Sequence, residues 1–199
     1  MEHSAIKLSS GFKITWDVGH VLNSFVDIPV EEQILDEHGW TTDSDKRPHW
    51  QMLEQLVYIS RFFYERFPVE CQLIAEELKK LQISLSEQQC DPLVQKFLDH
   101  EITPDRVHLL KIRPGDFVRP HRDERNFTVN IGLKNSNTAD TYISDSIGTT
   151  ANEFWNHPRY GFTMQDSDVY LLSVQHLHSV ESMVAQDSGI YRYLISYSI

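Results

Sequence analysis

Hydrophobic positions in the first half of the chain recur at helical spacing. Between residues 50 and 67 the apolar side chains return every three to four positions, which predicts an amphipathic helix over 50–67. Pro68 ends that helix or starts the next one, and a second apolar series predicts a helix over 68–82. Ser86 is a candidate N-cap for a third helix over 86–98.

After Pro104 the pattern changes to short apolar runs that alternate with polar residues and are separated by turn residues. Such runs are typical of β-strands. The expected strands are 107–112, 127–133, 141–144, 160–164, 169–174 and 191–199. Several short strands with turns between them indicate a sandwich or a barrel.

The first 48 residues give a weaker signal. Lys13–Trp16 and His20–Ile28 are candidate strands, and the polar segment 39–48 is expected to be a loop. No repeat or linker divides the chain, so we expect a single domain over 1–199. In that domain about 1–104 supplies N-terminal strands and supporting helices, and about 105–199 supplies the β-core. The expected fold class is mainly β with flanking helices (α+β).

Composition narrows the possible partners. The chain has 199 residues and a formal net charge of −11, which argues against binding to a nucleic-acid backbone or an anionic membrane. No apolar run reaches the roughly 18 residues of a membrane span, and the N-terminal segment lacks the apolar core of a secretory signal. We therefore expect a soluble, cytoplasmic protein. Whether Cys71 and Cys90 pair stays open.

Ten histidines direct attention to a metal site. In the tripeptide at 121–123, His121 and Asp123 project to the same face if the segment is extended. A second imidazole is available from His176 or His178, which follow the strand at 169–174. Two histidines and one carboxylate on one side of a metal are typical of non-haem Fe(II) oxygenases. The tripeptide alone also fits a surface turn, so its context matters.

That context resembles the Fe(II)/2-oxoglutarate-dependent oxygenase family over about 107–199. The segment HLLKIRPGDFVRPHRDERNFTVNIGL resembles the strand, Pro-Gly turn and His-x-Asp motif of the family. It is most similar to aspartyl/asparaginyl β-hydroxylases and to small amino-acid hydroxylases of the proline type. The segment DSDVYLLSVQHLHSVES resembles the later strand, which leads to the distal metal ligand in a His-x-Val pattern.

The resemblance implies a ligand set. His121, Asp123 and His178 would hold Fe(II), and His178 is preferred to His176 because a valine follows it at +2. Arg192, in GIYRYLISYSI, would bind the far carboxylate of 2-oxoglutarate. The gap between His178 and Arg192 is longer than the family usually shows, which a longer hairpin loop accommodates.

The strand after the His-x-Asp motif offers further polar side chains. Thr128 and Asn130 alternate with apolar neighbours and are candidates for holding the cosubstrate or the ligands. The resemblance also implies a fold, a double-stranded β-helix (a jelly roll, cupin-like) with helices from the N-terminal half packed on one sheet. It implies Fe(II), 2-oxoglutarate and O2 as the reaction's cofactor and cosubstrates.

The implied activity is hydroxylation of an unactivated C–H bond, with release of succinate and CO2. Arginines near the motif, together with the small chain, favour a free amino acid or a small peptide-like substrate. The candidate substrate-binding residues are Arg113, Arg119, Arg122 and Trp155, with Arg125 in the same basic group. Trp155 lies in an insertion, NEFWNHPRYGF, that either closes over the site or packs as a surface loop.

Three alternatives remain at this point. The substrate is an Asp, Asn or Pro side chain in a peptide or protein; the protein is a cupin-type metalloenzyme that does not use 2-oxoglutarate; or it is an interaction module on the same scaffold. The second alternative would have no need of Arg192, which makes that residue the discriminating one.

Overall fold

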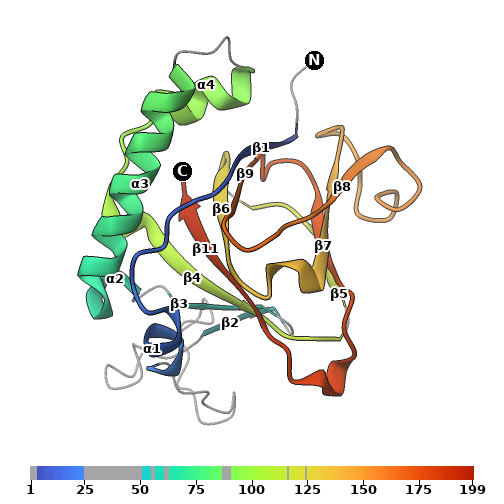
Figure 1. Cartoon of the computed structure of the whole chain (residues 1–199). Coiled ribbons are helices and arrows are strands. Elements are labelled where there is room, and N and C mark those ends of the chain that lie inside the picture. Colours follow the sequence, from blue (N-terminus) through green and yellow to red (C-terminus); the bar gives the residue numbers. More distant parts are fainter. Residues whose placement is uncertain are drawn as a thin grey trace.

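Two antiparallel sheets and a layer of helices make up the structure, a computed structural model (Figure 1). The described residues are 4–24, 51–54, 57–60, 63–86, 91–115, 117–123 and 125–199. The larger sheet contains β1 (Ala5–Ser10), β2 (Gln51–Glu54), β3 (Val57–Ser60), β4 (Val107–Ile112), β6 (Thr128–Lys134), β9 (Asp168–Leu172) and β11 (Arg192–Ser198). The smaller sheet contains β5 (Phe117–His121), β7 (Ala139–Ser144), β8 (Arg159–Thr163) and β10 (His178–Ser182).

The helices are α1 (Val18–Asn23), α2 (Phe63–Arg66), α3 (Pro68–Ser86) and α4 (Pro92–Leu98), with short 3-10 turns η3 (Pro104–Arg106), η4 (Ser136–Thr138) and η5 (Gln186–Ser188). None of the helices in the described ranges has the length and apolar character needed to cross a membrane.

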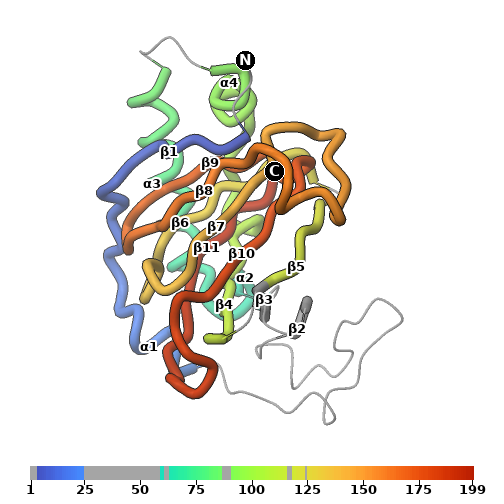
Figure 2. The backbone as a smooth tube through the Cα atoms, turned by 90° about the vertical axis from the view of Figure 1, so that its right-hand side faces the viewer, coloured from blue at the N-terminus to red at the C-terminus, as the bar shows by residue number. Residues whose placement is uncertain are grey.

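The strand order shows how the chain moves between the sheets. The larger sheet has the order β1-β9-β6-β11-β4-β3-β2, and the smaller has β5-β10-β7-β8 (Figure 2). From β4 onward the chain passes repeatedly from one sheet to the other, and only β7 and β8 are consecutive within one sheet. This alternation sets β5 and β10 side by side although they are far apart in sequence.

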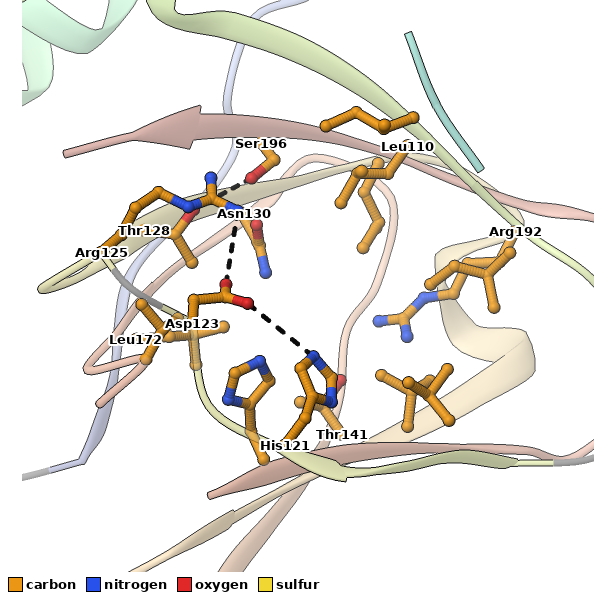
Figure 3. Close-up of a pocket in the computed structure, with 17 residues that line it drawn as sticks. Leu110, His121, Asp123, Arg125, Thr128, Asn130, Thr141, Leu172, Arg192 and Ser196 are labelled. Atoms are coloured by element: carbon orange, nitrogen blue, oxygen red, sulfur yellow. Dashed lines mark hydrogen bonds and ion pairs between the residues drawn. The ribbon is translucent and has the colours of Figure 1, made fainter. Parts of the chain in front are cut away.

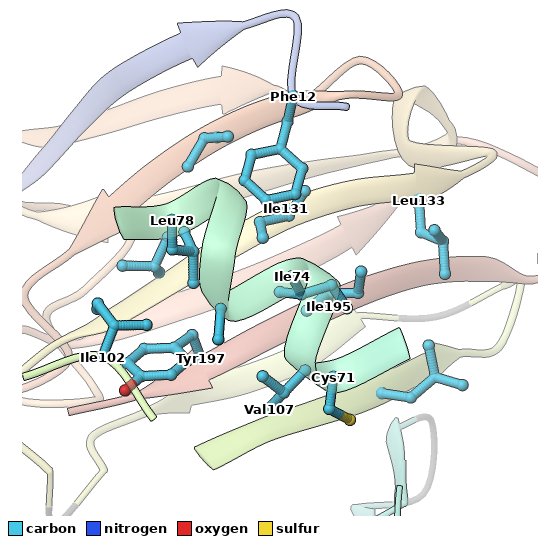
Figure 4. Close-up of a cluster of buried hydrophobic side chains, with 14 of the residues drawn as sticks. Phe12, Cys71, Ile74, Leu78, Ile102, Val107, Ile131, Leu133, Ile195 and Tyr197 are labelled. Carbon is cyan, nitrogen blue, oxygen red and sulfur yellow. The ribbon is translucent and has the colours of Figure 1, made fainter. Parts of the chain in front are cut away.

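A large apolar core lies between the helices and the outer face of the larger sheet. Ile74 and Leu78 of α3 are fully buried against Ile131 of β6 and Ile195 of β11 (Figure 4). Because side chains alternate along a strand, the neighbours of Ile195 point the other way, between the sheets. The helix layer therefore leaves one face of β11 available for a site.

Cys71 is a free thiol in this core, and burial raises its pKa to about 12. Its candidate partner Cys90 lies outside the described residues. A second, smaller core fills the space between the sheets, where Phe162 stacks on Tyr170 with ring centroids 4.0 Å apart. This inner core borders the pocket described below.

The expectation of a mainly β structure with flanking helices is confirmed. The helix expected over 68–82 is α3, which continues to Ser86. The six expected strands correspond to β4, β6, β7, β8, β9 and β11, with ends that differ by a few residues. The strands β1, β5 and β10 were not expected as separate elements, since each contains few apolar residues.

The helix expected over 50–67 is wrong. Its first part forms β2 and β3, and only Phe63–Arg66 is helical. Val57 and Ile59 are β-branched and alternate with other residues, and the backbone of β3 pairs with β4 from Val57↔Ile112 to Ser60↔Leu109. Pairing with the edge of an existing sheet outweighs a helical spacing of apolar residues.

The helix expected over 86–98 begins later, at Pro92. The carboxylate of Asp91 caps it by accepting from the Leu93 amide at 2.8 Å, and proline is well suited to a first helical turn. Ser86 instead ends α3, where its hydroxyl donates to the Ile83 carbonyl at 2.8 Å.

The N-terminal expectations are also corrected. Residues 13–16 form no strand, and 20–23 belong to α1. Asp17 is the N-cap of α1 and accepts from the His20 amide at 3.0 Å, and such a cap favours a helical start over an extended segment. The remainder of that expected strand, 25–28, and the expected loop at 39–48 lie outside the described residues.

Candidate metal centre

Three potential metal ligands meet where β5 and β10 lie side by side. His121 ends β5, Asp123 lies two residues beyond it, and His178 begins β10 directly opposite His121 in the pairing register. One ligand atom from each residue lies within 4.8 Å of the other two. Nε2 of His121 is 4.0 Å from Oδ1 of Asp123, and the two imidazole centroids are 4.2 Å apart. This spacing fits a shared metal ion.

Backbone carbonyls fix which nitrogen of each imidazole faces the cluster. Nδ1 of His121 lies 2.8 Å from the carbonyl oxygen of Arg119, and Nδ1 of His178 lies 3.1 Å from that of His176. A carbonyl oxygen only accepts, so each Nδ1 carries the proton. In the neutral form of each imidazole, Nε2 then keeps the lone pair that can bind a metal.

The electrostatics favour the neutral form of one ligand. Burial, and then the neighbouring imidazole of His121, lowers the pKa of His178 to about 4. His178 is consequently neutral at pH 7, which is the form that binds metals.

Asp123 is held at its backbone and at its side chain. Its amide donates to the Val174 carbonyl at 3.1 Å. Its Oδ2 accepts from the guanidinium of Arg125 at 3.3 Å (Figure 3), and the same guanidinium donates to the hydroxyl of Ser198. The other carboxylate oxygen, Oδ1, is the one that lies near His121.

Asp123 and the two histidines line a pocket between the sheets. Strands of the larger sheet contribute Ile59, Leu110, Ile112, Thr128, Asn130, Leu172, Arg192, Leu194 and Ser196. The smaller sheet and the connecting segments contribute Val118, His121, Asp123, Arg125, Thr141, Val174, His178 and Val180. Eight of the 17 lining residues are aliphatic, and the other nine carry the polar groups that define what the pocket can bind.

Arg192 is the most unusual of these polar groups. Its side chain is 1% exposed, and none of its three guanidinium nitrogens has a hydrogen-bond partner among the described residues. Figure 3 shows it pointing into the pocket from the side opposite Asp123. Burial lowers the pKa of Arg192 to about 10, so it stays charged at pH 7. A buried cation without a partner is costly, which indicates that an anionic ligand completes it.

The two polar candidates on β6 differ in their hydrogen bonding. Thr128 donates to the Tyr197 carbonyl at 3.0 Å and contacts the Ser196 hydroxyl at 2.9 Å, so its hydroxyl is satisfied. Asn130 Oδ1 is buried and lacks a partner among the described residues. Of the two, Asn130 has the unused hydrogen-bonding capacity in the pocket.

Of the four arginines in the basic group, Arg125 lines the pocket and the other three do not. Arg122 braces loops instead: Nε donates to the Gln175 carbonyl at 2.9 Å, and Nη2 donates to the Ile147 and Thr149 carbonyls at 2.5 Å each. Arg119 is exposed on β5, and Arg113 follows β4 outside the lining.

Two further candidates also lie outside the lining. Trp155 packs against Tyr142 with ring centroids 5.6 Å apart, and the guanidinium of Arg159 lies 4.9 Å from the Trp155 ring. The alternative ligand His176 is buried with its Nδ1 2.9 Å from the Ser144 carbonyl. The structure thus places His178, and not His176, with the other two ligands.

Sequence reasoning missed several pocket residues. Ser196 shares the strand face of Arg192 at i+4, so the alternation of β11 was a usable signal. Thr141, Val118 and Ile59 gave no such signal, because their place in the wall depends on how the two sheets face each other.

No protein-family model matches the sequence, and no curated protein matches it either. Among solved structures, AviO1 from Streptomyces viridochromogenes Tue57 is 16% identical with a TM-score of 0.48, and the match covers 83% of this chain and 75% of that one. A 2OG-Fe(II) oxygenase family oxidoreductase from Burkholderia pseudomallei is 18% identical with a TM-score of 0.35, over 46% of this chain and 40% of that one.

An oxalate oxidase is 12% identical with a TM-score of 0.35, and the match again covers 46% of this chain and 40% of that one. The chain thus spans less than half the length of the Burkholderia protein and of the oxalate oxidase. All three similarities fall below 20% identity and a TM-score of 0.5, so the function has to come from the chemistry of the site.

Proposed function

We propose that the protein is an Fe(II)- and 2-oxoglutarate-dependent dioxygenase. It hydroxylates an unactivated C–H bond of a free amino acid or a small peptide-like substrate and releases succinate and CO2. The observation that carries this proposal is the buried guanidinium of Arg192, which has no hydrogen-bond partner among the described residues and shares a pocket with His121, Asp123 and His178. The three ligands alone suit many metalloenzymes, whereas the added cation suits a dicarboxylate cosubstrate.

The donor set fits iron. Two imidazole Nε2 atoms and one carboxylate oxygen are the ligands of the facial triad found in non-haem Fe(II) oxygenases. When bound, iron and 2-oxoglutarate together supply the oxidising power that O2 chemistry needs to break a C–H bond. The chain's part is to keep both Nε2 atoms and one carboxylate oxygen turned toward one point.

Arg192 and Asn130 fit the cosubstrate. A planar guanidinium binds a carboxylate through two parallel hydrogen bonds, and the buried Asn130 amide adds a further polar contact. Aliphatic neighbours of Arg192, among them Ile112 and Leu194, exclude water from this end of the pocket and so strengthen the ion pair.

We also propose that the two sheets form the double-stranded β-helix, or cupin-like jelly roll, expected for this function. The support is the alternation of β4 to β11 between two facing sheets, with the ligands at the ends of β5 and β10. The choice of an amino acid-like substrate rests on the resemblance of the His-x-Asp segment to small amino-acid hydroxylases.

The test is anaerobic titration of the apoprotein with Fe(II) and then with 2-oxoglutarate. A visible metal-to-ligand charge-transfer band should form, and calorimetry should show about hundredfold weaker 2-oxoglutarate binding in Arg192→Met, because two charge-assisted hydrogen bonds are lost. Arg119→Met, exposed and outside the lining, is the matched control and should bind normally.

Each other outcome has a definite meaning. Iron binding without the band would favour a cupin-type metalloenzyme that does not use 2-oxoglutarate. Absence of metal binding would show that the triad is wrong. If both cofactor and cosubstrate bind, succinate release in a screen of free amino acids, followed by peptides containing Asp, Asn or Pro, identifies the substrate.

A further inference from the structure

Each of the three metal ligands has one hydrogen bond that fixes its orientation. For His121 and His178 the partner is a backbone carbonyl two residues earlier in the chain. Asp123 differs, because it lies beyond the last residue of β5 and no strand pairing sets the direction of its side chain. The group that contacts its carboxylate is the side chain of Arg125.

The Arg125 guanidinium connects Asp123 to the larger sheet. One terminal nitrogen lies 3.3 Å from Asp123 Oδ2, and the other donates to the hydroxyl of Ser198 in β11. The carboxylate is thus held by one oxygen, and its second oxygen is the one that lies 4.0 Å from Nε2 of His121. Arg125 itself lines the pocket but is not a metal ligand.

We propose that Arg125 is a positioning residue for Asp123. By holding Oδ2, it makes Oδ1 the ligating oxygen and keeps the carboxylate from turning or from binding through both oxygens. This leaves the remaining positions of the metal for other ligands. The inference rests on the metal site of the proposed function and adds a residue to it that the family resemblance does not supply.

The direction in which metal affinity changes when Arg125 is replaced distinguishes a positioning role from a simple charge effect. A guanidinium beside a divalent cation repels it, so loss of the charge alone would tighten metal binding. Loss of a hydrogen bond that orients a ligand weakens metal binding, by about tenfold or more where such partners have been removed from other metal sites. The two roles therefore predict opposite changes in the same dissociation constant.

The experiment titrates the full-length apoprotein with Mn(II) and follows the electron paramagnetic resonance signal of the free ion, without cosubstrate or turnover. Arg125→Met should bind Mn(II) about tenfold more weakly than the wild type. Arg125→Lys should also bind more weakly, because an ammonium keeps the charge but cannot bridge Asp123 and Ser198 with a planar fork. Ser198→Ala should give a smaller loss.

Arg122→Met is the matched control. Arg122 lies between His121 and Asp123 in the sequence, but its guanidinium donates to loop carbonyls outside the pocket. This substitution should lower the melting temperature and leave Mn(II) affinity unchanged. Equal or tighter Mn(II) binding by both Arg125 variants would overturn the inference alone. If the wild type itself binds no Mn(II), the proposed metal site falls and the inference falls with it. Should Arg125→Met not fold, Arg125→Lys and Ser198→Ala decide.

Discussion

His176 and His178 are two residues apart, and each has Nδ1 near a backbone carbonyl. They differ in whether the side chain lines the pocket. His178 lines the pocket with His121 and Asp123, whereas His176 is buried beside Ser144 and outside the pocket lining. At the scale of single residues, the same kind of hydrogen bond therefore orients a proposed metal ligand in one case and a packed core histidine in the other.

This difference predicts opposite behaviour of two alanine variants. His178→Ala should lose Mn(II) binding while it stays folded, because one of three ligands is gone. His176→Ala should keep Mn(II) affinity and lose about 1–3 kcal/mol of unfolding free energy, since the Ser144 carbonyl is left buried without its donor. Mn(II) titration and urea denaturation measure the two effects. Metal loss in His176→Ala, with retention in His178→Ala, would exchange their roles.

At the scale of elements, β6 depends on a close approach at Gly132. A Cβ built there would lie 2.2 Å from the carbonyl oxygen of Gln165, in the segment that leads to β9. Since Thr128 and Asn130 are on the same strand, this contact also supports the position of the pocket wall. The Gln165 backbone cannot move away from an added Cβ as easily as a flexible side chain can.

Gly132→Ala should therefore lower the unfolding free energy by about 2–3 kcal/mol, as overpacking of a tight site does. Gly11→Ala is the control, because nothing lies within 4 Å of a Cβ at that position. It should be neutral or slightly stabilising, since alanine restricts the unfolded chain. Urea denaturation of the two variants gives the comparison, and equal stability would show that β6 and the Gln165 segment separate easily.

The success of sequence-based prediction also varied by element. The strands after Pro104 were found because each has an alternating apolar pattern and clear turns around it. The segment 51–60 has apolar residues that suit either period, and only its pairing with β4 decides for strands. Local apolar patterns thus predicted the secondary structure where the local sequence determines it. They failed where pairing with another strand decides between helix and strand.

The candidate site follows the same rule. His121 and Asp123 could be found from their i, i+2 spacing, and the family resemblance added His178 and Arg192. The arginines at 113, 119 and 122 could not be separated from Arg125, because which of them reaches the pocket depends on how the two sheets and their loops pack.

At the scale of the whole molecule, two cores have different tasks. The helix-covered face of the larger sheet buries a continuous apolar cluster that includes Leu78 and Phe97. The space between the sheets holds a smaller core and, beside it, a pocket with the buried charge of Arg192, which has no hydrogen-bond partner in the part of the chain that the structure describes. The first core therefore stabilises the fold, and its contribution offsets the cost of a buried charge in the pocket between the sheets.

That division predicts that Arg192→Met makes the apoprotein more stable. Methionine fills a similar volume without a buried charge, so the unfolding free energy at pH 7 should rise by about 2 kcal/mol. With Mn(II) present, 2-oxoglutarate at a hundred times its dissociation constant should add about 2.7 kcal/mol to the wild type and almost nothing to the variant. Arg66→Met, on the exposed side of α2, controls for removal of an arginine. Urea denaturation with and without the cosubstrate measures both effects.

A less stable Arg192→Met apoprotein would mean that the guanidinium is already paired in the free protein, and the argument that a dicarboxylate completes it would then fail.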